Sequence, residues 1–392
     1  MLSVLPPARV APAVAAVLLI ACTSGTSSAP KASPTPSPRA TVSARPSPSP
    51  SLSEPGPLRF SVTTLASSLE APWALDFAKD GSIWFTERAG RVRVIRNGQL
   101  LPAPAVKLNV VSSPGCEGGL LGLALSGGDA FLYYTYPGSG GNTNRVSRFA
   151  IQGDQLVNER MILDGIPGGT CYHFGGRIKF GPDGRLYVTT GEGFVASRAA
   201  TPNGLSGKIL SVNPDGGDLK VFAWGFRNPQ GLAFDPQGRL YASNNGPTGD
   251  LGLCCHDTVD LVQEGKFYGW PAWAGNTQTR YGTGGLPAYT APIAESGNTV
   301  WAPSGITFYS PAKTQRAALL IAELSGQAVR RLLIDAADPG KVVSQDIVVQ
   351  GYGRLRDLEA GPDGCLYVLT SNRDGRGNPG GSDDRVLRLC PS

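Results

Sequence analysis

The chain has 392 residues, of which 52 are glycine and 17% are charged, and its formal net charge is +5. This composition is typical of a turn-rich all-β protein and excludes a helical bundle, which needs long runs of strong helix formers. The positive charge is mild and no basic cluster is interleaved with aromatic residues, so nucleic acid is not an expected partner. The length allows one large β domain or two ordinary domains.

The N-terminal segment has the pattern of an export signal. Arg9 provides a positive start, and residues 13–21 form an apolar run that is too short to span a bilayer comfortably. The run ends in Leu-Ile-Ala-Cys at residues 19–22, which resembles a bacterial lipobox with Cys22 as the lipidated residue; the alternative is an ordinary secretory signal. We predict a lipoprotein signal peptide over residues 1–22 and an extracytoplasmic protein that is lipid-anchored to the bacterial cell membrane.

Residues 23–57 consist mainly of Ser, Pro, Thr and Ala. Such a segment cannot bury enough apolar surface to fold, and its prolines keep it extended. We therefore predict a disordered tether that holds a globular domain, residues 58–392, away from the membrane.

The globular part contains a repeated unit, in which an apolar residue, a tight turn and an apolar strand follow one another. Four clear copies and two weaker ones lie at residues 77–87, 180–187, 234–241 and 360–367, and at residues 125–133 and 309–322. Their spacing of roughly 50 residues is typical of propeller blades. We predict an all-β, six-bladed β-propeller of four-stranded antiparallel blades, with a large loop insertion between residues 246 and 304.

Six cysteines follow Cys22, and an even number in an exported protein indicates disulfides. Cys365 begins one predicted strand and Cys390 ends another, so we predict that these two pair across neighbouring strands. Cys116 and Cys171 both lie in glycine-rich loops just before strands and form a second predicted pair.

The two remaining cysteines, Cys254 and Cys255, would form a rare vicinal bridge if they paired with each other. The sequence has no Cys-x-x-Cys spacing, so a zinc site is not expected. His256 lies beside these cysteines and is interpreted as structural.

The stretch from His173 to Glu192 contains one of only two histidines in the chain. Two β-branched or aromatic runs flank a Pro-Asp-Gly turn at residues 182–184, which predicts a hairpin. An antiparallel hairpin brings its two ends to one edge, so His173 and Glu192 could form an oriented general base. A hydrogen-bonded structural histidine remains the alternative.

Five loops are dense in glycine and polar residues, and propeller loops at one end of the blades converge on a central channel. They are residues 115–124, 171–177, 224–231, 244–250 and 353–357. In this order on a six-fold repeat, they resemble the soluble aldose sugar dehydrogenases that depend on pyrroloquinoline quinone (PQQ), the glucose/sorbosone dehydrogenase family. The resemblance extends from residue 69 to residue 389.

The resemblance implies an enzyme that oxidises aldose sugars at C1 to lactones by hydride transfer to PQQ, with Ca²⁺ beneath the cofactor and an electron acceptor that the sequence does not identify. His173 matches the general base and Glu192 the carboxylate that supports it. Arg227 matches the arginine that polarises the quinone carbonyl. Asn228 and Glu117 match neighbouring cofactor contacts.

Four further residues match the groups that hold the cofactor and the metal. Arg354 and Arg356 match arginines that bind the cofactor's carboxylates, a task for which guanidinium groups are suited. Gly246 and Pro247 match a pair whose backbone carbonyls bind Ca²⁺, which prefers oxygen ligands. Without the resemblance, Gly246-Pro247 is an ordinary turn, and the alternation of Arg354 and Arg356 indicates a solvated strand face.

Three positions depart from the glucose-specific members of the family. Tyr172 replaces an acidic residue, Glu117 replaces a glutamine and Ser325 replaces a lysine that contacts the cofactor. These changes point to the broader aldose-type branch. Two other functions stay open, namely a non-catalytic propeller that binds a protein or glycan, and a calcium-dependent propeller lactonase.

Overall fold

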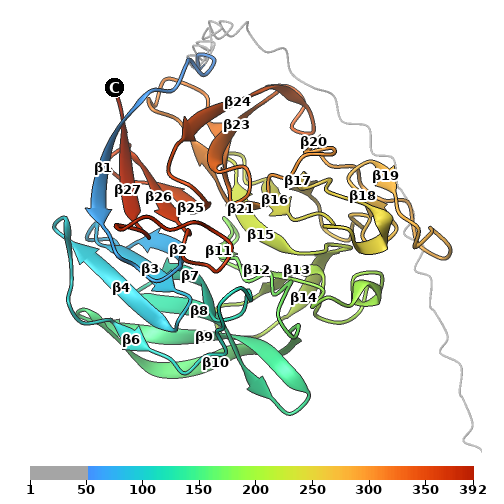
Figure 1. Ribbon diagram of the computed structural model, residues 1–392, viewed down its shortest axis with the longest axis horizontal. Coiled ribbons are helices and arrows are strands. Elements are labelled where there is room, and N and C mark those ends of the chain that lie inside the picture. Colours follow the sequence, from blue (N-terminus) through green and yellow to red (C-terminus); the bar gives the residue numbers. More distant parts are fainter. Residues whose placement is uncertain (1–51) are drawn as a thin grey trace, which may run out of the picture. The chain divides into compact units, whose positions relative to one another are not determined.

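The computed structural model describes residues 52–392 (Figure 1). The predicted signal peptide and most of the predicted tether lie outside the described residues. The first described residues contact the fifth blade, where Ser53 bridges to Gln315 and the carbonyl of Gly56 accepts a hydrogen bond from Arg331. Within residues 52–392, no helix is long and apolar enough to cross a membrane.

The chain forms six antiparallel sheets arranged as the blades of a ring (Figure 1). Blade one contains β2 (Pro72–Phe77), β3 (Ile83–Glu87), β4 (Arg91–Arg96) and β5 (Gln99–Leu100), and β6 (Val106–Lys107) also pairs with β4. Blade two contains β7 (Leu120–Ser126), β8 (Asp129–Gly138), β9 (Gly141–Gln152) and β10 (Gln155–Pro167). Blade three contains β11 (Ile178–Phe180), β12 (Leu186–Thr190), β13 (Lys208–Val212) and β14 (Lys220–Trp224).

The second half of the ring repeats this plan. Blade four contains β15 (Pro229–Phe234), β16 (Leu240–Asn244), β17 (Thr258–Val262) and β20 (Ala294–Glu295). Blade five contains β21 (Pro303–Tyr309), β22 (Ala318–Glu323), β23 (Ala328–Ile334) and β24 (Val342–Gln350). Blade six contains β25 (Leu355–Ala360), β26 (Leu366–Thr370), β27 (Val386–Pro391) and β1 (Phe60–Ala66).

The ring is closed by the two ends of the described chain. β1 pairs with β27, with Phe60 opposite Pro391 and Thr64 opposite Leu387, so blade six combines the first strand with the last three (Figure 1). This pairing supplies the outermost strand of blade six from the opposite end of the chain and so closes the ring. The predicted six-bladed propeller is confirmed.

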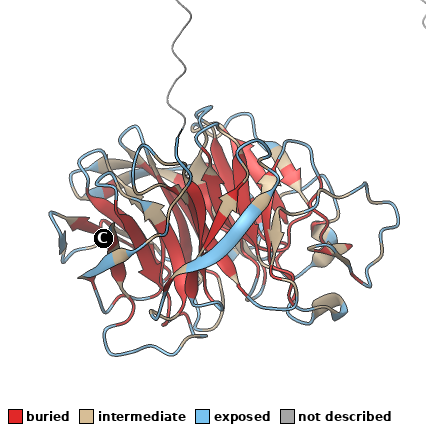
Figure 2. Ribbon diagram, turned by 90° about the horizontal axis from the view of Figure 1, so that it is seen from above, coloured by how far each residue is buried: buried red, intermediate tan, exposed pale blue. Residues whose placement is uncertain are grey.

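The repeated turns form as the sequence indicates. In blade three, Gly181 N–H donates to the carbonyl of Arg185, and Gly184 has a φ of +77°, the left-handed region that favours glycine. The strands that follow these turns, such as β12 and β26, are buried along their whole length. Figure 2 shows buried strands running through the ring and exposed loops at its ends.

The predicted insertion is present in blade four, where a small hairpin of β18 (Trp273–Ala274) and β19 (Thr277–Gln278) lies between β17 and β20. Two short 3-10 helices, η1 (Ala196–Arg198) and η2 (Asp250–Gly252), complete the elements of the described chain. Both predicted disulfides, Cys116–Cys171 and Cys365–Cys390, are confirmed. Cys254 and Cys255 form the vicinal bridge.

Candidate functional site

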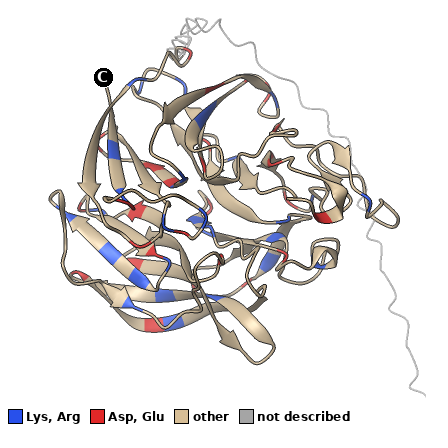
Figure 3. Cartoon of the chain, in the orientation of Figure 1, with Lys and Arg blue, Asp and Glu red and all other residues tan. Residues whose placement is uncertain are grey.

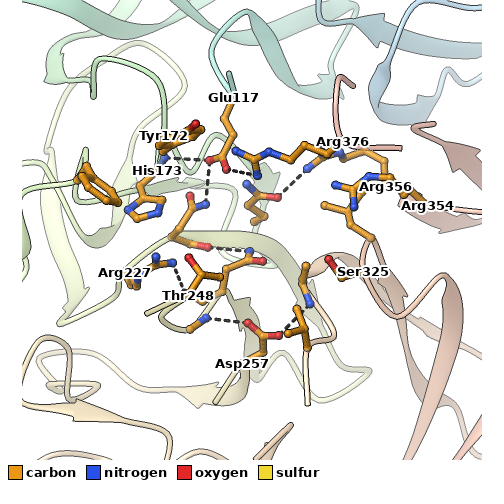
Figure 4. A pocket seen from close by; sticks show the side chains of 18 residues that line it. Glu117, Tyr172, His173, Arg227, Thr248, Asp257, Ser325, Arg354, Arg356 and Arg376 are labelled. Carbon is orange, nitrogen blue, oxygen red and sulfur yellow. Dashed lines mark hydrogen bonds and ion pairs between the residues drawn. The ribbon is translucent and has the colours of Figure 1, made fainter. Parts of the chain in front are cut away.

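A cavity of about 530 Å³ lies where the loops that precede the first strands of the blades converge (Figure 4). These first strands, β2, β7, β11, β15, β21 and β25, pack against one another around the centre of the ring. Glu117 precedes β7, His173 precedes β11, Asn228 precedes β15 and Arg354 precedes β25. The propeller thus brings residues that are distant in sequence to one cavity.

Seven of the nine predicted site residues line this cavity: Glu117, His173, Arg227, Asn228, Gly246, Arg354 and Arg356. Glu192 lies behind His173, and Pro247 lines a small second cavity beside Gly246. Figure 3 shows basic and acidic segments near the middle of the ring. The cavity has a charged lining, because Glu117, Asp257 and several arginines line it.

His173 and Glu192 are joined at the open end of the β11–β12 hairpin. His173 Nδ1 lies 2.5 Å from Glu192 Oε1, and the two residues are 5% and 1% exposed. Glu192 fixes the ring through Nδ1, and no described residue hydrogen-bonds the other nitrogen, Nε2. The backbone of His173 has a φ of +62°, a strained conformation for a residue with a side chain. The pair has the arrangement of an oriented proton acceptor that faces a cavity.

Glu117 connects three of the loops (Figure 4). Its Oε2 accepts hydrogen bonds from His173 N–H at 2.9 Å and Asn228 Nδ2 at 3.1 Å, and its Oε1 accepts one from Arg376 Nη1 at 3.0 Å. Burial acts to raise the pKa of this carboxyl, but the nearby imidazole and N–H of His173 and the charges of Arg376 and Arg356 outweigh burial and hold that pKa below its ordinary value. Glu117 is therefore a carboxylate that positions the histidine loop.

A basic wall of two arginines faces the cavity. Arg354 Nη2 lies 2.9 Å from Asp374 Oδ2, Arg356 Nη2 lies 3.5 Å from the same oxygen, and Arg356 Nη1 donates to Gln230 Oε1 at 2.7 Å. Burial lowers the pKa of Arg356; Asp374 opposes this effect, and the like charges of Arg354 and Arg88 add to it. The solvated strand face is the wrong interpretation, because Arg354 and Arg356 are 7% and 4% exposed.

The positive charge of the wall exceeds the negative charge of the carboxylate that pairs with it. Arg354 and Arg356 share the one carboxylate of Asp374. Arg88, whose charge also acts on Arg356, donates only to backbone carbonyls within the described chain. Arg356 Nε is buried and has no described hydrogen-bond partner. These features suit an anionic ligand with several carboxylates.

Arg227 is held in place by a carboxylate of the neighbouring loop. Its Nε and Nη2 donate to the two oxygens of Asp250 at 2.8 and 3.0 Å, and its guanidinium carbon lies 5.7 Å from the centroid of the Trp270 ring. The Arg227 charge and hydrogen bonds hold the pKa of Asp250 below its ordinary value, although burial opposes them. Arg227 is thus a fixed cation on the cavity wall.

Gly246 presents its backbone at the cavity next to a buried carboxylate. Its N–H donates to Asp257 Oδ1 at 2.8 Å, while Asp257 Oδ2 accepts N–H bonds from Trp301 and Ala302. Burial raises the pKa of Asp257, although these N–H groups and Arg227 oppose it. A Cβ on Gly246 would lie 1.9 Å from the Cys255 carbonyl oxygen, so only glycine fits there. The Asp257 carboxylate and the Cys255 backbone carbonyl thus lie beside Gly246, and oxygen atoms of these kinds are the ligands that Ca²⁺ prefers.

Several lining residues were not predicted: Phe194, Gln230, Asn245, Thr248, Asp257, Val300, Ala302, Leu324 and Arg376. Arg376 and the unpredicted Asp374 come from the segment after β26, which carries no repeated motif. Tyr172, Glu117 and Ser325, the three positions of departure, all line the cavity.

The chain matches the family model of glucose/sorbosone dehydrogenases over residues 69–377. It is 30% identical to the aldose sugar dehydrogenase YliI of Escherichia coli, over 81% of this chain and 92% of the relative. Among solved structures, it is 39% identical to a Thermus thermophilus protein assigned as an oxidoreductase (glucose dehydrogenase), with a TM-score of 0.75 and coverage of 84% and 100%. It is 31% identical to a PQQ-bound aldose sugar dehydrogenase of Streptomyces coelicolor, with a TM-score of 0.72 and coverage of 86% and 99%.

Fold, cavity and relatives together define an enzyme of the sugar dehydrogenase class. The chain belongs to the glucose/sorbosone dehydrogenase family.

Proposed function

We propose that the enzyme oxidises aldose sugars at C1 to lactones, with PQQ and Ca²⁺ held in the cavity. The observation that carries this proposal is the buried His173–Glu192 pair beside the Arg354–Arg356 wall in one cavity. The residues fit the cofactor, because PQQ carries three carboxylates and the wall has unbalanced positive charge with a buried, unpartnered Arg356 Nε. The PQQ-bound Streptomyces coelicolor relative supports the choice of cofactor.

In this proposal His173 is the general base. His173 Nε2 accepts the proton of the C1 hydroxyl, while Nδ1 stays bonded to Glu192, which stabilises the imidazolium as it forms. The bound quinone supplies the hydride acceptor for C1. Asn228 and Glu117 keep the histidine loop in place through their hydrogen bonds to each other and to the backbone of that loop.

The remaining predicted residues would hold the cofactor and the metal. Arg354 and Arg356 would bind carboxylates, and Arg227 would place a fixed positive charge where negative charge develops on an oxygen. The backbone carbonyls of Gly246 and Pro247 would bind Ca²⁺.

We also propose that the protein is exported and lipid-anchored at Cys22, and that it passes electrons to an acceptor outside the cytoplasm. The lipobox-like sequence at residues 19–22 supports the anchor. The three disulfides support export, because such bonds persist in oxidising compartments.

The test is a titration of the cofactor-free protein with PQQ in the presence of Ca²⁺, followed by dye reduction with a panel of aldoses. We expect a bound-cofactor spectrum and sugar-dependent reduction, and His173→Ala should abolish reduction but leave the spectrum. The exposed Asp338→Asn is the control. Absence of both spectrum and reduction, or full activity in His173→Ala, would refute the proposal and favour a non-catalytic or hydrolytic propeller.

A further inference from the structure

The disulfide between Cys254 and Cys255 joins neighbours in the sequence, whereas the other two disulfides span separations of 55 and 25 residues. In the chain-entropy account, a disulfide stabilises a fold by closing a loop in the unfolded chain, and the stabilisation grows with the length of that loop. A bridge between adjacent residues closes almost no loop. It therefore constrains its own two residues and contributes little to the stability of the propeller.

The bridge lies in the blade-four loop, which we define as residues 245–257 between β16 and β17. Cys255 packs against the start of this loop, because a Cβ on Gly246 would lie 1.9 Å from the Cys255 carbonyl oxygen. Cys254 pairs with Thr248 as an isolated antiparallel β-bridge. The backbone of the two bridged residues thus supports the part of the loop that carries Gly246.

The same loop carries groups that the proposed function uses. Asp250 accepts two hydrogen bonds from Arg227, the fixed cation on the cavity wall. Gly246 and Pro247 would supply the backbone carbonyls that bind Ca²⁺. A change in the conformation of the blade-four loop therefore reaches both the cation and the metal ligands.

The two bridged residues differ in accessibility, since Cys254 is exposed whereas Cys255 is only 3% exposed. The other four cysteines of residues 52–392 are half-buried or buried. A disulfide is cleaved by a thiolate that attacks one of its sulfurs, and access influences which disulfide reacts first. A dithiol in solution therefore reaches Cys254 before the other described cysteines.

We propose that Cys254–Cys255 is a thiol–disulfide exchange site, and that its reduction by a protein dithiol outside the cytoplasm weakens the binding of Ca²⁺ and PQQ. A thiolate of the partner attacks the Cys254 sulfur, the S–S bond breaks, and the sulfur of Cys255 leaves as a thiolate and takes up a proton. The second thiol of the partner then releases Cys254, so the partner becomes a disulfide and the bridge becomes two thiols, with two electrons and two protons transferred.

Reduction returns conformational freedom to the two residues that support Gly246, so its carbonyl is held less firmly. The inference rests on the proposed function, because that function places Ca²⁺ at Gly246.

The first test uses the cofactor-free protein. Limited treatment with dithiothreitol, followed by alkylation and peptide mass spectrometry, should label Cys254 and Cys255 before the other four cysteines. Amide hydrogen exchange in residues 246–257 should then become faster by about threefold or more, while the buried strand β12 keeps its protection. Labelling of Cys116 or Cys171 first, or unchanged exchange in the blade-four loop, would overturn the proposal.

The second test measures the Ca²⁺ concentration at half-maximal PQQ binding. This concentration should rise by about fivefold or more under conditions that reduce only the vicinal bridge, and it should return after reoxidation. The double variant Cys254→Ser with Cys255→Ser should need the raised concentration with or without dithiothreitol. The control, Cys365→Ser with Cys390→Ser, keeps the vicinal bridge and should respond to dithiothreitol as the wild type does.

An unchanged Ca²⁺ requirement after reduction, or a response to dithiothreitol in the variant without the vicinal bridge, would refute the exchange site. If PQQ does not bind at all, the proposed function fails, and the order of alkylation and the exchange rates still decide whether the bridge constrains the blade-four loop.

Discussion

The imidazole of His173 and the carboxylate of Glu192 lie 2.5 Å apart at the two ends of one hairpin, and both are almost fully buried. The hairpin pairs Ile178 with Val188 and so brings its two ends together, and the hydrogen bonds of the histidine loop to Glu117 and Asn228 complete the placement of His173. Glu192 Oε2 has no described hydrogen-bond partner, so within the described residues the Glu192 carboxylate is hydrogen-bonded only to His173.

Glu192→Gln tests this relationship. The amide keeps the shape but removes the charge that stabilises the imidazolium, so we expect kcat to fall by about 100-fold or more while PQQ affinity changes little. Steady-state kinetics and a PQQ titration measure the two quantities. In the double variant with His173→Ala, little further loss should occur, because the two residues act as a unit. A kcat within about twofold of the wild-type value would contradict the assigned role.

Cys116–Cys171 should affect the site as well as the stability. The disulfide joins the loop of Glu117 to the loop of His173, and Glu117 N–H also donates to the carbonyl of Cys171 at 2.8 Å. Replacing both cysteines by serine should lower the free energy of unfolding by about 2–5 kcal/mol and weaken PQQ binding at temperatures where the variant is folded.

The matched control for this variant is the double replacement of Cys365 and Cys390, which lie in blade six away from the cavity lining. It should also lower the melting temperature but leave binding unchanged. Equal effects of the two double variants on binding would show that the first disulfide has no specific role at the site.

The propeller itself was predictable because its signal is local. Five of the six blades repeat a glycine turn before a buried strand, and hydrogen bonds within a few residues fix the turn, as at Gly184. The order of the five loops then indicated the site. The His173–Glu192 contact followed from the hairpin alone.

What the sequence could not predict depends on closure of the ring. Asp374 and Arg376 come from a long segment after β26 that has no repeat pattern. Arg376 lines the cavity and Asp374 pairs with the lining residue Arg354, because the ring places this segment beside the other blades' loops. In sequence, Asp257 is one of two acidic residues in the loop between β16 and β17, and only the fold places three N–H groups around it. The alternation of Arg354 and Arg356 shows that they share a face, but not that this face is a buried channel rather than solvent.

Gly246→Ala tests the predicted metal loop. The new Cβ would lie 1.9 Å from the carbonyl oxygen of Cys255, so the loop must move and the adjacent backbone carbonyls with it. We expect the Ca²⁺ concentration needed for PQQ binding to rise by about tenfold or more. Gly284→Ala, where a Cβ meets no atom within 4 Å, is the control. If the two variants require the same Ca²⁺ concentration, Gly246 does not position the metal.

Asp260 gives a prediction for the dependence of stability on pH. It lies on β17, is 2% exposed, and accepts a hydrogen bond from Thr258 Oγ1 at 2.9 Å; burial raises its pKa from 3.8 to about 7. Between these two values the folded protein holds a proton that the unfolded chain releases. The free energy of unfolding should therefore fall as the pH rises, by up to about 1.4 kcal/mol per pH unit from this one group.

Asp260→Asn removes this titration and isolates it from the other buried acids. The difference in unfolding free energy between wild type and variant should decline from pH 4 to pH 7 and level off above pH 7, where the neutral amide is favoured over a buried carboxylate. Urea denaturation at several pH values measures the difference, and the exposed Asp338→Asn should leave the slope unchanged. A wild-type minus Asp260→Asn difference that stays constant with pH would mean that Asp260 is already ionised at low pH in the folded protein.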